Sequence, residues 1–209
     1  MRILWLLEEL ALPYEITLYR RNPKTYRAPP ELTAIHPRGR APVVVVDGTV
    51  LAESGAIIEH LVERFAPDTL GPDSDRRQDY RFWMHYAEGS LMPPLLVKLL
   101  MDRVRSAKLP FFVKPIAARV AGTLDKNYTD PELAGHYSFI DDSLRGQSWL
   151  LGERLTGADI QMSYPLQAAA DRGNLPDACA NIRAWLDRVA ARPAFQRAVQ
   201  RDRDALAAG

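Results

Sequence analysis

Hydrophobic residues at helical spacing open the chain. They fall at i, i+3, i+4 and i+7 and so share one face of a helix, with Glu8 and Glu9 pointing away from it: Ile3, Leu6, Leu7 and Leu10. We predict a helix that begins at residue 1 or 2 and is ended by Pro13. Residues 14–19 alternate in the period of two that is typical of a strand. The following prolines and charges predict a connector, with one or two helical turns between Pro30 and Ile35.

A β-hairpin is predicted between Pro42 and Leu51. Four valines follow Pro42, and Asp47-Gly48 can supply the positive φ angles of a two-residue turn before the next apolar residues. Ser54 then opens a segment that reaches Phe65 with apolar residues at helical spacing. This part of the chain therefore predicts two antiparallel strands followed by a helix.

Every element predicted beyond residue 75 is a helix. A break containing Pro67, Gly71 and Pro72 separates the two halves of the chain. Helical spacing then covers the ranges 76–106, 115–128, 131–144, 158–171 and 182–192. Thr156 and Asp159 have the spacing of a capping box, which we interpret as a folding feature without a chemical role.

Charge, length and cysteine content exclude several functional classes. Lys and Arg number 27 and Asp and Glu 26, so a net charge of +1 gives no general attraction for nucleic acid or an anionic membrane. The longest later apolar run, residues 41–46, is far shorter than the ~18 residues of a membrane span. A single cysteine, Cys179, allows no internal disulfide and favours a reducing cytoplasm.

Common catalytic and metal-binding signatures are absent from the sequence. It contains no nucleophile elbow, zincin motif, Walker A loop or dinucleotide fingerprint. Its histidines lack the spacing of metal ligands: His36, His60, His85 and His136. We therefore predict neither a metal nor a resident cofactor.

Two short segments carry a more specific chemical signal. In Gly39-Arg40-Ala41-Pro42 the proline starts a strand, and the Ala41-Pro42 bond is a candidate cis peptide; the alternative is an ordinary trans proline. Glu53-Ser54 lies at a helix N-terminus, where free amides and the helix dipole attract a carboxylate. The alternative for Ser54 is a plain helix cap.

Taken together, these segments resemble the cytosolic glutathione transferases, and most closely their bacterial and fungal branch. The likeness covers nearly the whole chain and rests on the run from Arg2 to Leu10, Pro13-Tyr14-Glu15, Ala41-Pro42, Glu53-Ser54, and the capping box of the helical half. It implies an α/β thioredoxin-like N-terminal domain in residues 1–67, a linker in 68–75, and an all-α C-terminal helical domain in 76–209.

The resemblance also implies an activity. Such a protein conjugates the glutathione thiolate to a hydrophobic electrophile, or reduces a peroxide with it, and glutathione is a co-substrate rather than a bound cofactor. The alternative is a non-catalytic binding or structural protein of the same fold. A homodimer is expected, with the helix of residues 54–65 and the long helix after the linker at its interface.

Individual roles follow from the resemblance and the residue chemistry. Ser54 is expected to hold the γ-glutamyl carboxylate and Glu53 the ammonium group, while Ala41, extended before Pro42, offers its backbone to the cysteinyl residue. Arg40 or His36 is a candidate for the glycyl carboxylate, with a solvated loop charge as the alternative. Candidates for the second-substrate pocket share one side of a long helix, with burial in the core as the alternative: Met84, Glu88 and Met92.

The start of the chain departs from the family pattern. Glutathione transferases place a strand and a catalytic Ser, Tyr or Cys before the helix that here begins at Arg2. We therefore expect the natural protein to carry roughly ten to fifteen more N-terminal residues, about one strand and a turn. The alternative is a weakened relative that has lost this strand. No residue in this numbering is assigned as the catalytic one.

Overall fold

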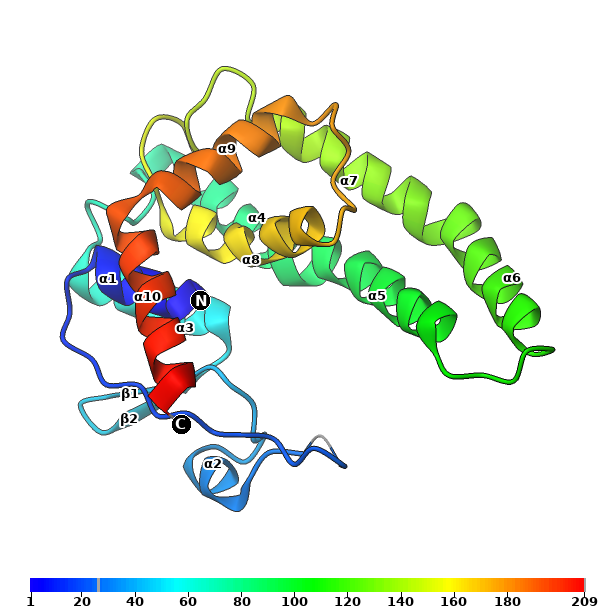
Figure 1. The fold of residues 1–209 in the computed structure, drawn as a ribbon. Coiled ribbons are helices and arrows are strands. Elements are labelled where there is room, and N and C mark those ends of the chain that lie inside the picture. Colours follow the sequence, from blue (N-terminus) through cyan, green and yellow to red (C-terminus); the bar gives the residue numbers. More distant parts are fainter. Residues whose placement is uncertain (26, 209) are drawn as a thin grey trace.

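The computed structural model describes residues 1–25 and 27–208 as a small α/β part and a larger helical part (Figure 1). The first part contains α1 (Arg2–Glu9), α2 (Pro30–Ile35), β1 (Val43–Val46), β2 (Thr49–Ala52) and α3 (Ser54–Phe65). The second contains α4 (Arg77–Tyr86), α5 (Met92–Ser106), α6 (Lys114–Leu124), α7 (Asp130–Ser143), α8 (Gly157–Asp171), α9 (Ala180–Ala191) and α10 (Pro193–Ala208). The architecture is thus a thioredoxin-like N-terminal domain followed by an all-α domain, as predicted.

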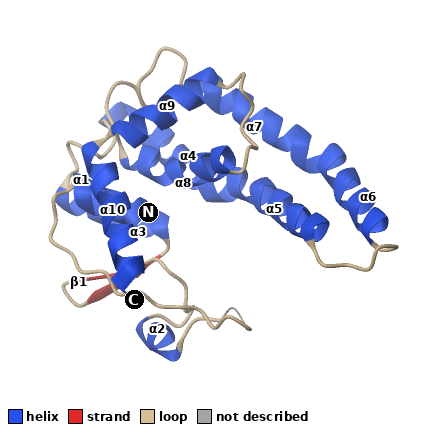
Figure 2. Cartoon of the chain, in the orientation of Figure 1, coloured by secondary structure: helices blue, strands red, loops and turns tan. Residues whose placement is uncertain are grey.

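The predicted hairpin is confirmed. β1 and β2 pair antiparallel, with Val43 opposite Ala52 and Val46 opposite Thr49, and they are drawn in red in Figure 2. The turn residues Asp47 and Gly48 have φ angles of 48° and 77°, the left-handed conformation that a two-residue hairpin turn requires. The hairpin leads directly into α3.

The predicted strand over residues 14–19 is wrong in this structure, which leaves the segment as an extended loop. Alternating residues form a strand only when a neighbouring backbone offers hydrogen-bond partners. Among the described residues β1 and β2 pair only with each other, and neither pairs with this segment. Tyr14 is anchored by its side chain instead, since its hydroxyl donates to Glu8 Oε1 at 2.7 Å.

Two pairs of helices are continuous, and the first pair covers the single helical range 76–106 predicted from the sequence. α4 runs into α5 through the π-helical turn η2 (Ala87–Leu91), and α6 runs into α7 through η3 (Asp125–Thr129). The ends of α5 and α6 form a hairpin that projects from the body of the molecule (Figure 1), and we call residues 92–128 the arm. Large apolar side chains are exposed on the arm, above all Phe111, which is 85% exposed.

The core lies where the two domains meet. α1 packs against α3, α8 and α10, and its Trp5 and Leu6 are fully buried. α8 runs through the centre of the helical domain and is buried over most of its length, with Pro165 inside it. The C-terminal helix thus returns to cover the first helix of the chain.

Asp159 at the start of α8 does more than the predicted capping box requires. The box with Thr156 is present, with the Thr156 amide 3.0 Å from Asp159 Oδ2. Asp159 Oδ1 also accepts hydrogen bonds from the Leu150 amide at 2.9 Å and from Trp185 Nε1 at 3.1 Å. Burial raises the pKa of this fully buried carboxyl, and the hydrogen bonds oppose that effect. Asp159 therefore joins the start of α8 both to α9 and to the loop that precedes α8.

The acidic residues of α1 form ion pairs with arginines at and just before α10, which the sequence pattern did not reveal. Glu9 pairs with Arg192 just before α10, and Glu8 pairs with Arg197 at 2.7 Å. Hydrogen bonds from Tyr14 and Arg197 hold the pKa of the Glu8 carboxyl below its ordinary value. These pairs fasten α10 to α1 and keep the two ends of the helical core together.

Candidate functional site

A cavity of about 160 Å³ lies at the junction of β1, α3 and α1. Its walls come from both domains: Arg2, His36, Arg38, Arg40, Ala41, Pro42, Ala52, Glu53, Ser54 and Glu88. All six residues predicted for glutathione binding are in this set, together with Glu88 from the predicted second-substrate pocket. The structure brings these residues to one place, and their individual roles remain predictions.

Glu53 and Ser54 owe their positions to the start of α3. Glu53 is the N-cap residue, with a φ of 67°, and its carbonyl accepts the first helical hydrogen bond from Ile57 at 2.9 Å. Its side chain makes no capping bond, so its carboxylate is available to a ligand. A positive φ at a non-glycine residue is a strained conformation of the kind found at binding sites. Ser54, 7% exposed, begins the helix next to the free amides of the first turn.

The loop before β1 presents backbone groups to the same cavity. The Ala41-Pro42 peptide bond is cis, the first of the two alternatives that the sequence left open. Ala41 makes no hydrogen bond to another backbone group of the described chain. Its N–H and C=O are therefore available, which is the requirement for binding a peptide backbone as an added strand.

Arg2 of α1 and Glu88 of the helical domain meet in the wall of the cavity. Arg2 Nη1 lies 2.6 Å from Glu88 Oε1 and 3.2 Å from the Gln161 carbonyl oxygen. The guanidinium also lies over the Tyr164 ring, 5.1 Å from its centroid. The Arg2 side chain is 13% exposed and that of Glu88 48% exposed. The pair joins the first turn of α1 to the π-helical turn η2.

Sequence reasoning missed Arg2, Arg38 and Tyr164 as residues at or beside this site. One signal was available for Arg2, because a basic residue in the first turn of a helix opposes the helix dipole. Such a residue needs a compensating anion, and its presence predicts one nearby. For Arg38 and Tyr164 the sequence offered no comparable signal.

The other predicted second-substrate residues lie away from this cavity lining. Met84 is 4% exposed and belongs to the hydrophobic core, where its Cε approaches the position that a β-carbon on Gly55 would occupy. Met92 is partly buried against the same core. Their role toward a second substrate remains a prediction.

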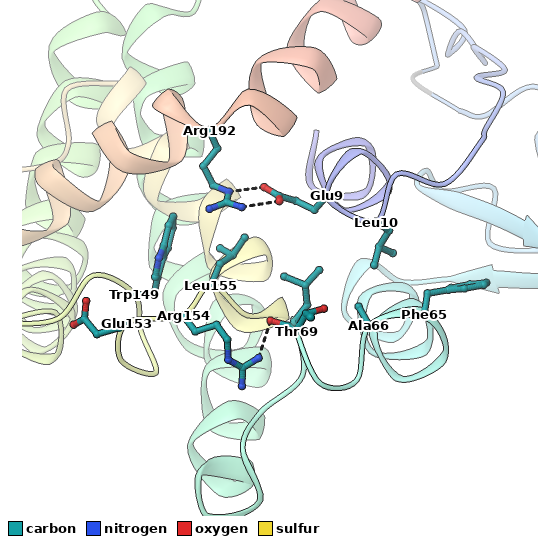
Figure 3. A pocket seen from close by; sticks show the side chains of 11 residues that line it. Glu9, Leu10, Phe65, Ala66, Thr69, Trp149, Glu153, Arg154, Leu155 and Arg192 are labelled. Carbon is teal, nitrogen blue, oxygen red and sulfur yellow. Dashed lines mark hydrogen bonds and ion pairs between the residues drawn. The ribbon is translucent and has the colours of Figure 1, made fainter.

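A larger cavity of about 560 Å³ lies between α1, the end of α3 and the loop before α8 (Figure 3). None of the predicted site residues lines it. The two arginines in its wall bind other protein groups: Arg192 pairs with Glu9, and Arg154 donates to the Thr69 carbonyl oxygen at 2.7 Å. Since its charges are already satisfied, we interpret this cavity as part of the domain junction.

Arg154 contacts four polar groups of the segment between the domains. Its Nη1 donates to three backbone carbonyl oxygens, those of Asp68 at 3.2 Å, Thr69 at 2.7 Å and Gly71 at 3.0 Å. Its Nη2 also donates to Asp73 Oδ1 at 2.7 Å. One side chain of the helical domain therefore holds most of the predicted linker.

Other chemical features of the described residues are few. They contain no cluster of His, Cys, Asp and Glu that could hold a metal ion. Cys179 is buried, and burial raises the pKa of its thiol, which does not favour a role as a nucleophile. Over the same residues, no helix has both the length and the apolar character needed to cross a membrane.

Comparisons with known proteins agree with this architecture. The profile "Glutathione S-transferase, N-terminal domain" matches residues 1–64, and the profile "Glutathione S-transferase, C-terminal domain" matches residues 100–193. The chain is 33% identical over 204 residues to glutathione S-transferase 1 of Saccharomyces cerevisiae, covering 93% of this chain and 87% of the relative. It is 35% identical over 205 residues to glutathione S-transferase 3 of Schizosaccharomyces pombe, covering 97% and 84%.

Solved structures show the same fold. A crystal structure of a glutathione S-transferase from Actinobacillus pleuropneumoniae has a TM-score of 0.70 at 33% identity, covering 95% of this chain and 86% of that one. A family member from Pseudomonas fluorescens, solved with two glutathione bound, has a TM-score of 0.72 at 23% identity, covering 94% and 86%. With both domain profiles matched and relatives above 30% identity along almost its whole length, the chain belongs to the glutathione S-transferase family.

Proposed function

We propose that this protein transfers the thiolate of glutathione to a hydrophobic electrophile. Residues 1–67 carry the glutathione site, residues 68–75 are the linker, and residues 76–209 supply the wall for the electrophile. The observation that supports this proposal is the single cavity lined by Glu53, Ser54 and the loop before β1. Family membership supports the class of reaction.

The charges around the cavity match those of glutathione. At neutral pH the tripeptide carries an ammonium group and two carboxylates. Ser54 and the free amides of α3 suit the γ-glutamyl carboxylate, and Glu53 suits the ammonium group. Arg40 and His36 are the partners for the glycyl carboxylate. His36 Nδ1 is buried without a hydrogen-bond partner in the described chain, so a ligand could satisfy it.

The proposed chemistry needs an ionised thiol beside an electrophile. The thiol proton passes to solvent, the sulfur lone pair forms a bond to the electrophilic carbon, and the leaving group departs with its bonding pair. With a peroxide, sulfur attacks the terminal oxygen, the O–O bond breaks, and the other oxygen leaves as an alcohol or water after taking a proton from solvent. A second glutathione then converts the sulfenic acid to disulfide and water. Glu88, Met84 and Met92 stay proposed for the second substrate, and half-exposed Tyr164 beside Arg2 extends that wall.

The working unit in this proposal is a cytoplasmic homodimer. Its support is the exposed apolar surface of the arm, which a second copy would remove from water. The large side chains on that surface come from α5, α6 and the turn between them: Leu96, Leu100, Phe111, Phe112, Ile116 and Val120. Phe65 at the end of α3 is also exposed, in keeping with the expected contribution of that helix. Light scattering at micromolar concentration tests this part, and a mass near 23.5 kDa would contradict it.

Calorimetric titration with glutathione tests the site itself. Ser54→Ala and Glu53→Gln should each weaken binding by about 1–3 kcal/mol, the scale of a charge-assisted hydrogen bond. Ser106→Ala and Glu63→Gln, at exposed positions that do not line the cavity, are the matched controls and should bind like the parent protein. Absence of binding by the parent protein would refute the proposal.

A conjugation assay with several electrophiles then separates catalysis from binding alone. The transferase proposal expects turnover that falls in parallel with glutathione affinity in the two site variants. Binding of glutathione without turnover of any electrophile or peroxide would favour the non-catalytic alternative.

A further inference from the structure

We propose that Arg2 stabilises the glutathione thiolate and that Glu88 positions Arg2 for this task. The inference rests on the proposed function, because it requires glutathione in the cavity between Ser54 and Ala41. It adds a catalytic residue and a positioning residue, taken from opposite domains, to the residues already discussed.

The placement of Arg2 has no explanation in helix stability. Arg2 is the first residue of α1, where the positive end of the helix dipole disfavours a cation. Its side chain is mostly buried, which adds a desolvation cost. Glu88 of the helical domain compensates this charge at 2.6 Å, and the pair lies in the wall of the cavity, where a ligand anion can also reach the guanidinium.

Once the charged groups of glutathione are assigned, its thiol is left as a partner for Arg2. In the proposed pose the γ-glutamyl end lies at α3, the cysteinyl backbone lies along Ala41, and the glycyl end lies near Arg40 and His36. The cysteinyl side chain is the remaining polar group, and Arg2 lines the same small cavity. A free thiol has a pKa of about 8.5 and is mostly protonated at neutral pH, so a nearby cation promotes its ionisation.

The contacts of Arg2 hold its guanidinium in one orientation. Nη1 is shared between Glu88 Oε1 and the Gln161 carbonyl oxygen, and the guanidinium carbon lies over the Tyr164 ring. Among these groups only Glu88 is charged, and a negative charge near the sulfur disfavours the thiolate. Because the Glu88 side chain is about half exposed, solvent weakens this repulsion. Its contribution is the hydrogen bond that fixes Arg2, and a neutral acceptor of the same shape can make that bond.

The ionisation step is a simple proton loss. The S–H bond breaks, its electron pair stays on sulfur, and the proton goes to water. The guanidinium donates a hydrogen bond to the sulfur anion and keeps its own protons, because an arginine side chain does not act as a proton donor in proteins. The anion then attacks the electrophile as described above.

Ultraviolet absorbance of the bound thiolate, followed against pH, tests the proposal. In the parent protein the bound thiol should titrate below its ordinary value, and Arg2→Met should raise its pKa by at least about one unit. Arg2→Lys, which keeps the charge, should restore part of this shift. Glu88→Gln should keep the parent value, whereas Glu88→Ala, which releases Arg2, should raise it. Arg64→Met removes a cation of α3 that pairs with Asp47 outside the cavity, and should change nothing.

Binding of S-methylglutathione, which has no ionisable thiol, is measured alongside. Parent and Arg2→Met proteins should bind it equally if Arg2 acts on the thiolate alone. An unchanged thiol pKa in Arg2→Met, or loss of S-methylglutathione binding at a normal Tm, would overturn the role of Arg2 and leave the proposed function standing. Failure of the parent protein to bind either compound would overturn both. If Arg2→Met does not fold, Glu88→Ala decides, and a parent-like thiol pKa in that variant would overturn the inference.

Discussion

Glu9 and Arg192 form a two-pronged ion pair, with Oε1 2.5 Å from Nε and Oε2 2.7 Å from Nη2, although 183 positions separate them. Trp5 Nε1 also donates to Glu9 Oε1 at 2.7 Å, and the Arg192 guanidinium lies over Trp149, 5.6 Å from its ring centroid. This cluster unites the first helix, the loop before α8 and the start of α10. The C-terminal helix is thereby fixed to the first helix of the chain.

Removing one partner of this pair should be strongly destabilising. Arg192→Met leaves the Glu9 carboxylate, whose side chain is 9% exposed, without its cation, and we expect a loss of about 3 kcal/mol in the free energy of unfolding. The double variant Glu9→Gln/Arg192→Met should recover part of that loss. Arg145→Met, which breaks an exposed pair with Asp142, is the control and should change it by less than about 1 kcal/mol. Urea unfolding measures these changes. Equal losses of stability in Arg192→Met and Arg145→Met would contradict a special role for the Glu9–Arg192 pair.

Asp159 should matter more to folding than a helix cap does. A cap alone contributes ~1 kcal/mol, but Asp159→Ala also strips hydrogen bonds from the buried Leu150 amide and the Trp185 indole. We expect a loss of about 3 kcal/mol, with Asp159→Asn intermediate, because the amide keeps one acceptor. Glutathione affinity per folded molecule should stay at the parent value. Weaker binding at full stability would show that Asp159 has a role in the site.

Gly157 marks a close approach between helices. A β-carbon there would lie 2.4 Å from Tyr80 Oη and 3.0 Å from Ile58 Cγ2. Gly157→Ala should therefore lower the Tm, since the neighbouring side chains are packed and must shift. Tyr80→Phe removes the nearest atom, a buried hydroxyl that has no hydrogen-bond partner in the described chain. The combined variant should be more stable than Gly157→Ala alone, and a simple sum of the two single effects would argue against the clash.

Asp125 gives the arm a predictable response to acid. Burial alone would raise the pKa of this carboxyl, but hydrogen bonds from Thr129, Arg105 and Lys98 lower it overall from its ordinary value of 3.8. The side chain is 5% exposed, with Thr129 Oγ1 2.7 Å and Lys98 Nζ 3.1 Å from its oxygens. The charged form is thus favoured in the folded protein.

The sign of the pH effect follows from that lowered pKa. Asp125 stabilises the fold fully above its unfolded pKa, and this contribution disappears as the pH falls through the lower folded value. Asp125→Asn should lower the Tm at neutral pH. The loss in the free energy of unfolding should be about 2 kcal/mol, the contribution of a hydrogen-bonded charge. The difference from the parent should narrow below about pH 4. Thermal melts across this range measure it, and a constant difference would refute the prediction.

The sequence could predict the elements that a few neighbouring residues specify. Asp47-Gly48 specifies the hairpin turn within two residues, and Thr156 with Asp159 specifies a cap within four, so both were predictable. The segment 14–19 has the pattern of a strand, but pairing depends on a distant backbone that no local pattern encodes.

The site divides in the same way. Glu53, Ser54 and Ala41 lie near one another in the sequence and carry a motif, so their gathering around one cavity was predictable. Arg2 and Glu88 are 86 positions apart, and their contact depends on how the two domains pack. An argument from helical spacing could place Glu88 on a face, but it could not say that the face meets α1.

The contacts of Arg154 bear on how members of this family can be recombined. Three carbonyl groups and one carboxylate of the segment 68–73 converge on this single guanidinium, so the segment is bonded through these groups to the helical domain as well as, through its amides, to Ala66 after α3. A chimera joined just after residue 67 keeps segment and arginine from the same parent. One joined at residue 75 separates them, and its success would depend on whether the other parent carries an equivalent side chain. The natural seam for exchanging halves therefore lies at the end of α3, before the predicted linker begins.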